Sequence, residues 1–273
     1  MNFAEKLQQA SQRNNSLLCI GLDPDPSRIP PHLGSGAHAV VAFNKAIIRA
    51  TQDIACAYKP NLGFYTVYGH DGIRALQETR RAIPDDIPAI LDAKVGDIDV
   101  TSTAYAQGYF GEMGFDAVTA QPYLGRDGLE PLFNWRDRCV FILAKTSNPG
   151  SGDLQDLKLS GTDPERTVYE HVASQVEEWQ GTFGTCGLVA GATYPHEVEK
   201  IRQLAPNAPM LIPGIGTQGG NLEATVKAAL GSGSGPVAIN ASRSIIYAGE
   251  GLNYIEAVRK AALALRDQIN QAS

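Results

Sequence analysis

Eight short apolar segments, each followed by a more polar stretch, constrain the fold of this chain more than any other feature. Their nearly continuous apolarity is typical of strands that are buried on both faces of a parallel sheet. The segments cover residues 17–23, 56–60, 88–94, 116–122, 139–147, 187–193, 209–216 and 236–242. Eight strands alternating with helices in 273 residues predict an α/β fold, a single (β/α)8 TIM barrel.

The segments between these strands have the composition of helices. They cover residues 38–54, 71–83, 101–113, 164–180, 195–205 and 221–230, and a closing helix is expected at 254–269. A doubly wound open sheet is the alternative, but it more often has fewer strands or a GxGxxG turn, and no such turn follows the first strand here. No shift in composition divides the chain, so residues 1–273 are expected to form one domain.

Two polar segments read as long loops, residues 148–164 and 231–235. The first follows the fifth strand and contains glycines. Loops after barrel strands build the active sites of such folds, so we expect this segment to be a lid over the site.

Composition excludes several classes of protein. With 43% hydrophobic and 19% charged residues the chain is globular, and a net charge of −6 argues against a nucleic-acid partner. No apolar run approaches the roughly 18 residues of a membrane span. The four cysteines are far apart and form no CxxC pair, so we expect buried, reduced thiols in a cytoplasmic protein.

The third predicted strand ends in an unusual row of charges. Side chains alternate along a strand, so Asp92 and Lys94 share the face of Ile90, and Asp97 follows in the turn. If Ile90 faces the barrel interior, the two charged side chains point to its mouth. Buried charges are costly unless they are paired, and carboxylates beside a lysine satisfy this condition. A salt-bridged strand end would explain the row structurally, but charges also end the neighbouring strands, which favours a functional site.

Other strand ends carry weaker signals. Asp23 closes the first strand and could simply form a turn before a proline. Lys59 ends the second strand, where a single lysine is often a surface residue. Ser147, with Thr146 and Asn148, ends the fifth strand. Their hydroxyl and amide groups suit a flat polar ring as well as an ordinary turn.

The loops after the seventh and eighth strands have the features of a phosphate site. Residues 211–221 are glycine-rich and include Gln218, and Arg243 follows the eighth strand. Backbone N–H groups of a glycine loop and a guanidinium both match phosphate oxygens. An ordinary glycine turn would explain the loop, and a surface arginine would explain Arg243. Neither explains why both features occur together at the place where barrels often bind phosphate.

With these residues assembled, the sequence resembles the orotidine 5′-phosphate decarboxylase family, in particular its longer bacterial branch. The branch signature is close to DAKRGDIGNTA, and residues 92–104 here read DAKVGDIDVTSTA. The resemblance extends over nearly the whole chain. It includes the segments at 19–26, 58–61, 144–151, 211–220 and 242–248.

The resemblance implies a role for each residue of the charged row. Lys94 corresponds to the family's proton donor, Asp92 and Asp97 to its two acids, and Lys59 to the second lysine of the network. Asp97 and Thr101 correspond to residues that reach across a homodimer interface into the partner's site.

The resemblance also implies the substrate contacts. Asp23 corresponds to a ribose-binding acid and Ser147 to a pyrimidine-binding hydroxyl. Gln218 and Arg243 correspond to phosphate contacts, and Pro213 opens the loop that closes over the ligand. The partner is then a small-molecule nucleotide, with no metal and no cofactor in the reaction.

The sequence departs from the family pattern at four positions. Val95 stands where the branch usually has Arg, and Asp99 and Val100 where it has Gly-Asn. Ser242 stands where relatives often have Gly. Val95 should point away from the mouth, opposite to Lys94, so we expect the chemistry to be retained.

The implied reaction is the loss of CO2 from orotidine 5′-phosphate to give uridine 5′-phosphate, the last step of de novo UMP synthesis. Three alternatives stay open at this point. A Mg²⁺-dependent decarboxylase of keto-sugar phosphates shares the D-x-K-x-x-D row. A lyase with a Schiff-base lysine would need Lys94 to lose its proton first. A non-catalytic nucleotide-binding protein would bind uridine 5′-phosphate without turnover.

Overall fold

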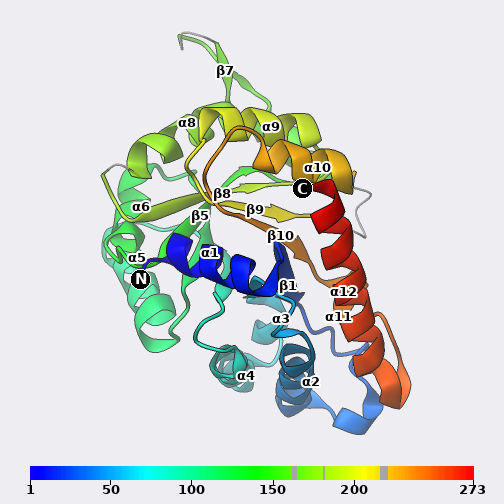
Figure 1. Cartoon of the computed structure of the whole chain (residues 1–273). Coiled ribbons are helices and arrows are strands. Elements are labelled where there is room, and N and C mark those ends of the chain that lie inside the picture. Colours follow the sequence, from blue (N-terminus) through cyan, green and yellow to red (C-terminus); the bar gives the residue numbers. More distant parts are fainter. Residues whose placement is uncertain (162–164, 181, 216–220) are drawn as a thin grey trace.

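In the computed structural model, which describes residues 1–161, 165–180, 182–215 and 221–273, eight parallel strands form one sheet with helices around it (Figure 1). The strands are β1 (Leu18–Leu22), β2 (Ala57–Pro60), β3 (Ile90–Val95), β4 (Ala117–Ala120), β5 (Cys139–Lys145), β8 (Thr185–Ala190), β9 (Met210–Pro213) and β10 (Val237–Ala241). Their order in the sheet is β2-β1-β10-β9-β8-β5-β4-β3.

The sheet closes into a barrel because its two end strands, β2 and β3, also meet. An isolated parallel bridge joins Tyr58 to Ala89. A second bridge joins Asn61 to Asp92 at the carboxyl ends of the same strands. The predicted (β/α)8 TIM barrel is therefore confirmed, and the open doubly wound sheet is excluded.

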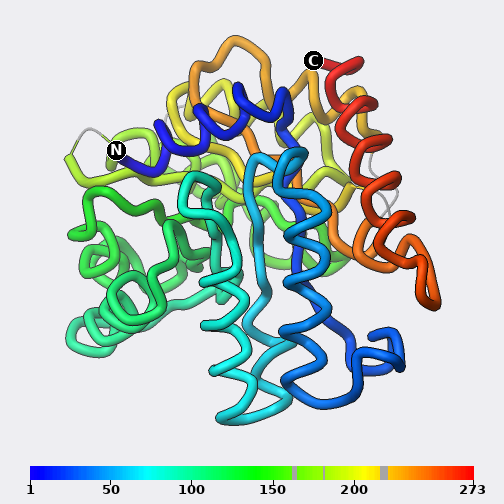
Figure 2. The backbone as a smooth tube through the Cα atoms, turned by 60° about the horizontal axis from the view of Figure 1, so that its bottom comes forward, coloured from blue at the N-terminus to red at the C-terminus, as the bar shows by residue number. Residues whose placement is uncertain are grey.

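Helices cover the outside of the barrel in alternation with the strands. The main ones are α2 (Gly36–Thr51), α4 (Gly69–Ala82), α5 (Asp99–Ala106), α8 (Val168–Gln180), α9 (Pro195–Leu204), α10 (Leu222–Leu230) and α12 (Tyr254–Ala272), and α3 (Gly63–Thr66) and α11 (Arg243–Ile246) are single turns. Figure 2 shows α2 and α4 side by side along one flank. Each predicted helical segment overlaps one of these helices, although α5 ends at Ala106 whereas the prediction ran to residue 113.

The helix α6 (Arg126–Phe133) was not predicted from the sequence. It contains Pro131, which has no N–H to donate and normally ends a helix. The helix forms nevertheless because Leu129, Leu132 and Phe133 are buried against the barrel core. Tertiary packing outweighs the local propensity here.

The amphipathic N-terminal segment forms a helix, α1 (Phe3–Asn14), that closes the amino-terminal end of the barrel (Figure 1). Phe3 and Leu7 belong to the same interior cluster as Ile90. The Lys6 ammonium donates to Asp116 at 2.7 Å beside it. With this end filled, a ligand site is expected at the opposite end, where the strands finish.

The predicted loop after β5 has structure of its own. It contains a turn of helix, α7 (Gly152–Gln155), and a strand, β6 (Lys158–Leu159), which pairs antiparallel with β7 (Arg166–Thr167). Residues 162–164 lie outside the described residues, so the prediction that this loop is a lid stays a prediction.

Two expectations from composition can be compared with the structure. All four cysteines are buried and free, as predicted. Of the helices in the described part of the chain, none is long and apolar enough to cross a membrane.

Candidate active site

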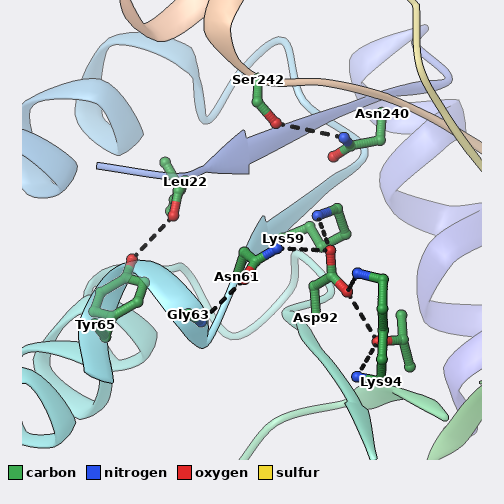
Figure 3. Close-up of polar contacts among 10 residues, drawn as sticks. Leu22, Lys59, Asn61, Gly63, Tyr65, Asp92, Lys94, Asn240 and Ser242 are labelled. Atoms are coloured by element: carbon green, nitrogen blue, oxygen red, sulfur yellow. Dashed lines mark hydrogen bonds and ion pairs between the residues drawn. The ribbon is translucent and has the colours of Figure 1, made fainter. Parts of the chain in front are cut away.

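The carboxylate of Asp92, at the mouth of the barrel, is the centre of a hydrogen-bonded cluster (Figure 3). Its Oδ2 accepts from Lys59 Nζ at 2.8 Å and from Asn61 Nδ2 at 3.3 Å. Its Oδ1 accepts from Lys94 Nζ at 2.6 Å and from Thr119 Oγ1 at 3.0 Å. Four donors from three adjacent strands therefore fix this one side chain.

The electrostatics of the cluster keep its buried members charged. Burial alone would raise the pKa of Asp92, but the Lys59 and Lys94 ammonium groups hold it well below its usual value. Burial alone would lower the pKa of Lys59, but the Asp92 and Asp23 carboxylates raise it above its usual value. Two lysines thus share the Asp92 carboxylate, so the Lys59–Asp92–Lys94 cluster by itself carries one net positive charge.

The backbone of β3 is irregular where it presents Lys94. The register against β4 shifts between Leu91 and Val95, and Lys94 has a φ of +49°. A lysine in this left-handed region is strained, and such strain persists only where the surroundings hold it. The Lys94 N–H donates to Thr119 Oγ1 at 2.9 Å, which supplies that support.

The two faces of β3 are as predicted. Ile90 lies in the interior cluster, whereas Val95 is buried in the outer core against the helices. The Lys94 side chain is half-exposed, with 49% of its surface accessible, and lines the open cavity. Val95 therefore points away from the charged row, as expected from the sequence.

Two adjoining cavities open above the cluster and share Lys59, Asp92, Ser147 and Pro213. The larger, of about 400 Å³, also contains Lys94, Thr119, Leu143, Thr146, Asn148 and Gln155. The smaller, of about 160 Å³, also contains Asp23, Ile215, Asn240, Ser242 and Arg243. The larger suits a flat ring with polar edges, and the smaller suits an anionic or hydroxylated group near an arginine.

Most of the residues predicted for the site meet at these cavities. Those found there are Asp23, Lys59, Asp92, Lys94, Ser147, Pro213 and Arg243. Gln218 lies outside the described residues, so its predicted phosphate contact stays a prediction.

Asp97 and Thr101 do not reach the cluster within one chain. Asp97 Oδ1 accepts from the backbone N–H of Ile98 at 2.9 Å, and no ion pair joins Asp97 to Lys94 among the described residues. Thr101 is exposed on α5. Within the chain Asp92 therefore pairs with Lys94, and the predicted role of Asp97 and Thr101 across a homodimer interface stays a prediction.

Sequence reasoning missed several residues of the site, among them Thr119 and Gln155. Thr119 lies two residues after Ala117 of the interior cluster, and this alternation could have placed it at the mouth. Gln155 comes from α7, and its Oε1 accepts from the Thr146 N–H at 2.9 Å. No strand periodicity leads to Gln155, because its position depends on the path of the loop.

Lys145, the last residue of β5, is a buried lysine. The Lys145 ammonium donates to Asp156 Oδ1 at 2.5 Å and lies 5.0 Å from the centre of the Tyr194 ring. Cation–π contact and ion pairing satisfy its charge. The ion pair with Asp156, the residue that follows α7, also holds α7 against the end of β5, where Ser147 and Gln155 line the larger cavity.

Comparisons with known proteins agree over the whole chain. The sequence model of the "Orotidine 5'-phosphate decarboxylase / HUMPS family" matches residues 16–258. A curated protein of Thermomicrobium roseum named orotidine 5′-phosphate decarboxylase is 48% identical over 271 residues, covering 99% of this chain and 96% of the relative. One of the same name from Roseiflexus castenholzii is 47% identical over 272 residues, covering 100% of this chain and 98% of the relative.

Solved structures give the same result. OMP decarboxylase of Leishmania donovani superposes with a TM-score of 0.86 at 39% identity, covering 100% of this chain and 98% of that chain. UMP synthase of the same organism gives 0.87 at 40% identity, and this chain covers 56% of it.

The support that Thr119 gives to β3 can be measured. We expect Thr119→Val to lower the free energy of unfolding by about 2 kcal/mol, because Asp92 Oδ1 and the Lys94 N–H both lose a hydrogen-bond partner. Urea denaturation measures the change. Thr103→Val, at an exposed position of α5, is the matched control and should stay within about 0.5 kcal/mol of wild type. Equal effects of the two substitutions would contradict this account of the β3 backbone.

Proposed function

The chain belongs to the orotidine 5′-phosphate decarboxylase / HUMPS family, and we propose that it converts orotidine 5′-phosphate to uridine 5′-phosphate and CO2, the last step of de novo UMP synthesis. The observation that carries the proposal is the Lys59–Asp92–Lys94 cluster at the barrel mouth, beside a cavity of about 400 Å³. The names of the curated relatives support this substrate over a keto-sugar phosphate.

Lys94 is the proposed proton donor. Cleavage of the C–C bond releases CO2 and leaves the electron pair on ring carbon C6. The Lys94 ammonium lowers the energy of this developing charge and then transfers a proton to C6, which completes the product. The half-exposed side chain can regain its proton from water. No metal or cofactor is required for these steps.

Asp92 and Lys59 position the donor. Asp92 binds Lys94 at 2.6 Å and is itself fixed by Lys59 at 2.8 Å. This arrangement is preorganised, so little reorientation is needed when charge develops on the substrate. The net positive charge of the cluster also favours an anionic substrate.

The remaining residues are proposed to bind the rest of the nucleotide. The ring would occupy the larger cavity beside Ser147, with the ribose near Asp23 and the phosphate near Arg243. Gln218 and the loop after Pro213 would close over the phosphate. Binding energy from this remote group can then drive closure and order the charged site.

We further propose that the protein is a homodimer in which Asp97 and Thr101 complete the partner's site. Large apolar side chains are exposed around Asp97, including Val100 at 75% and Tyr123 at 76%, with Ile98 and Leu124 also exposed. Exposed apolar groups that gather in this way favour a protein interface. A second copy covering them would bring a further carboxylate toward each Lys94.

Removal of the proposed donor tests the function. In EDTA, wild type should turn over orotidine 5′-phosphate, and Lys94→Ala should reduce kcat at least about a thousandfold while still binding uridine 5′-phosphate. The fall in substrate absorbance measures turnover. Lys45→Ala, which removes a solvent-exposed ion pair with Glu78, should keep wild-type activity. An inactive wild type that decarboxylates keto-sugar phosphates with Mg²⁺ would overturn the proposed function.

Mixing of inactive variants tests the shared site. If Asp97 acts in the partner's site, a heterodimer of Lys94→Ala and Asp97→Ala subunits contains one site with both changes and one intact site. Refolding the two variants together should therefore restore up to about a quarter of wild-type activity. Each variant refolded alone is the control. No recovery, with heterodimers shown to form, would mean that Asp97 does not act across the interface.

A further inference from the structure

The side chain of Asn240, which has no assigned role, forms part of the floor of the smaller cavity. Ala238 of β10 faces the barrel interior, and Asn240 lies two residues further along the same face. The residue is only 6% exposed, yet it lines the cavity together with Asp23 and Arg243. It thus lies at the mouth of the barrel, on the side opposite Thr119 in the order of the strands.

The amide of Asn240 is only partly satisfied. Its Nδ2 is directed at Ser242 Oγ at 3.5 Å (Figure 3). Its Oδ1 is buried and has no hydrogen-bond partner among the described residues. Asp23 Oδ1, in the same cavity, is also buried and also has no hydrogen-bond partner among the described residues. Buried acceptors without donors are costly, so two of them in one cavity indicate a ligand that donates hydrogen bonds there.

The space around Asn240 depends on Gly21 of β1, the strand between β2 and β10. A Cβ at this position would lie 1.8 Å from Ser242 Oγ and 3.3 Å from Asn240 Oδ1. The missing side chain therefore leaves room for both groups. It also explains how the Ser242 side chain is accommodated beside β1.

The chemistry of the cavity distinguishes between two parts of a nucleotide. A phosphate presents acceptor oxygens and negative charge, which suits Arg243 but not the Asp23 carboxylate or an amide oxygen. A ribose presents hydroxyl groups that can donate to both. Two unpartnered acceptors beside an arginine thus match a sugar diol next to a phosphate.

We propose that Asn240 is a ribose-binding residue: its Oδ1 accepts a hydrogen bond from one ribose hydroxyl while Asp23 accepts from the other. The inference rests on the proposed function, because it takes the ligand to be a ribonucleotide 5′-phosphate. Asn240 would then contribute directly to a selectivity of the site for ribonucleotides over deoxyribonucleotides. A ligand without one of these hydroxyls would leave a buried acceptor unpaired. Sites that hydrogen-bond a ligand hydroxyl discriminate strongly against analogues that lack it.

The test measures the dissociation constants of uridine 5′-phosphate and of its 2′-deoxy and 3′-deoxy analogues by titration calorimetry. In wild type each missing hydroxyl should weaken binding about tenfold or more. The penalty for an analogue is the ratio of its dissociation constant to that of uridine 5′-phosphate. In Asn240→Val the penalty for one of the two analogues should fall to about twofold or less. In Asp23→Ala the penalty for the other analogue should fall. Asn240→Ala, which removes the amide without filling its space, should lose the same discrimination as Asn240→Val.

The control is Asn270→Val, whose amide donates to Asn15 O at the amino-terminal end of the barrel. It should keep both wild-type penalties. If wild type decarboxylates orotidine 5′-phosphate but both Asn240 variants also keep both penalties, the ribose role of Asn240 is wrong and the proposed function stands. If wild type neither binds uridine 5′-phosphate nor turns over the substrate, the proposed function fails and the inference fails with it.

Discussion

The carboxylate of Asp92 lies between two ammonium groups, and the geometry of the barrel mouth depends on this interaction. Lys59 comes from β2, Asp92 and Lys94 from β3, and Thr119 from β4, so three adjacent strands are joined at their carboxyl ends. Charges at this depth are stable only when they are paired and hydrogen-bonded. The register shift in β3 and the strained backbone of Lys94 are held in place by the same contacts.

Different strands place different functional groups around the mouth of the barrel. On one side, β2, β3 and β4 supply the charged cluster next to the larger cavity. On the other side, β1 and β10 supply Asp23, Asn240 and the space above Gly21 around the smaller cavity. A nucleotide that spans both cavities would have its reacting ring at the cluster and its sugar and phosphate held apart from it. In the proposed reaction, this separation would let binding energy from the remote phosphate be used without neutralising the proposed donor, Lys94.

The sequence predicted the parts of this structure that follow from simple periodicity. The eight strands, the inward face of Ile90 and the row through Asp92 and Lys94 all result from alternation along a strand. Thr119 and Asn240 lie two residues after Ala117 and Ala238 of the interior cluster, so alternation could have placed both at the mouth. Their hydrogen-bond partners could not be predicted, because these depend on how the strands and their ends lie against one another. The predicted role of Asp97 across a homodimer interface stays a prediction, because within one chain Asp97 binds only the local backbone among the contacts described for it. Helix α6 was missed because packing outweighed Pro131.

The most direct measurement of the central interaction is the free energy of unfolding of wild type and Asp92→Asn across the acid range. The pKa of Asp92 is lowered in the folded state, so its stabilisation is present above the unfolded pKa of about 4 and is lost as the pH falls through the folded value. The substitution should therefore cost about 3 kcal/mol at pH 7 and progressively less below about pH 4. A cost that is small at pH 7, or that does not change with pH, would contradict the account of Asp92 as the ionised centre of the site.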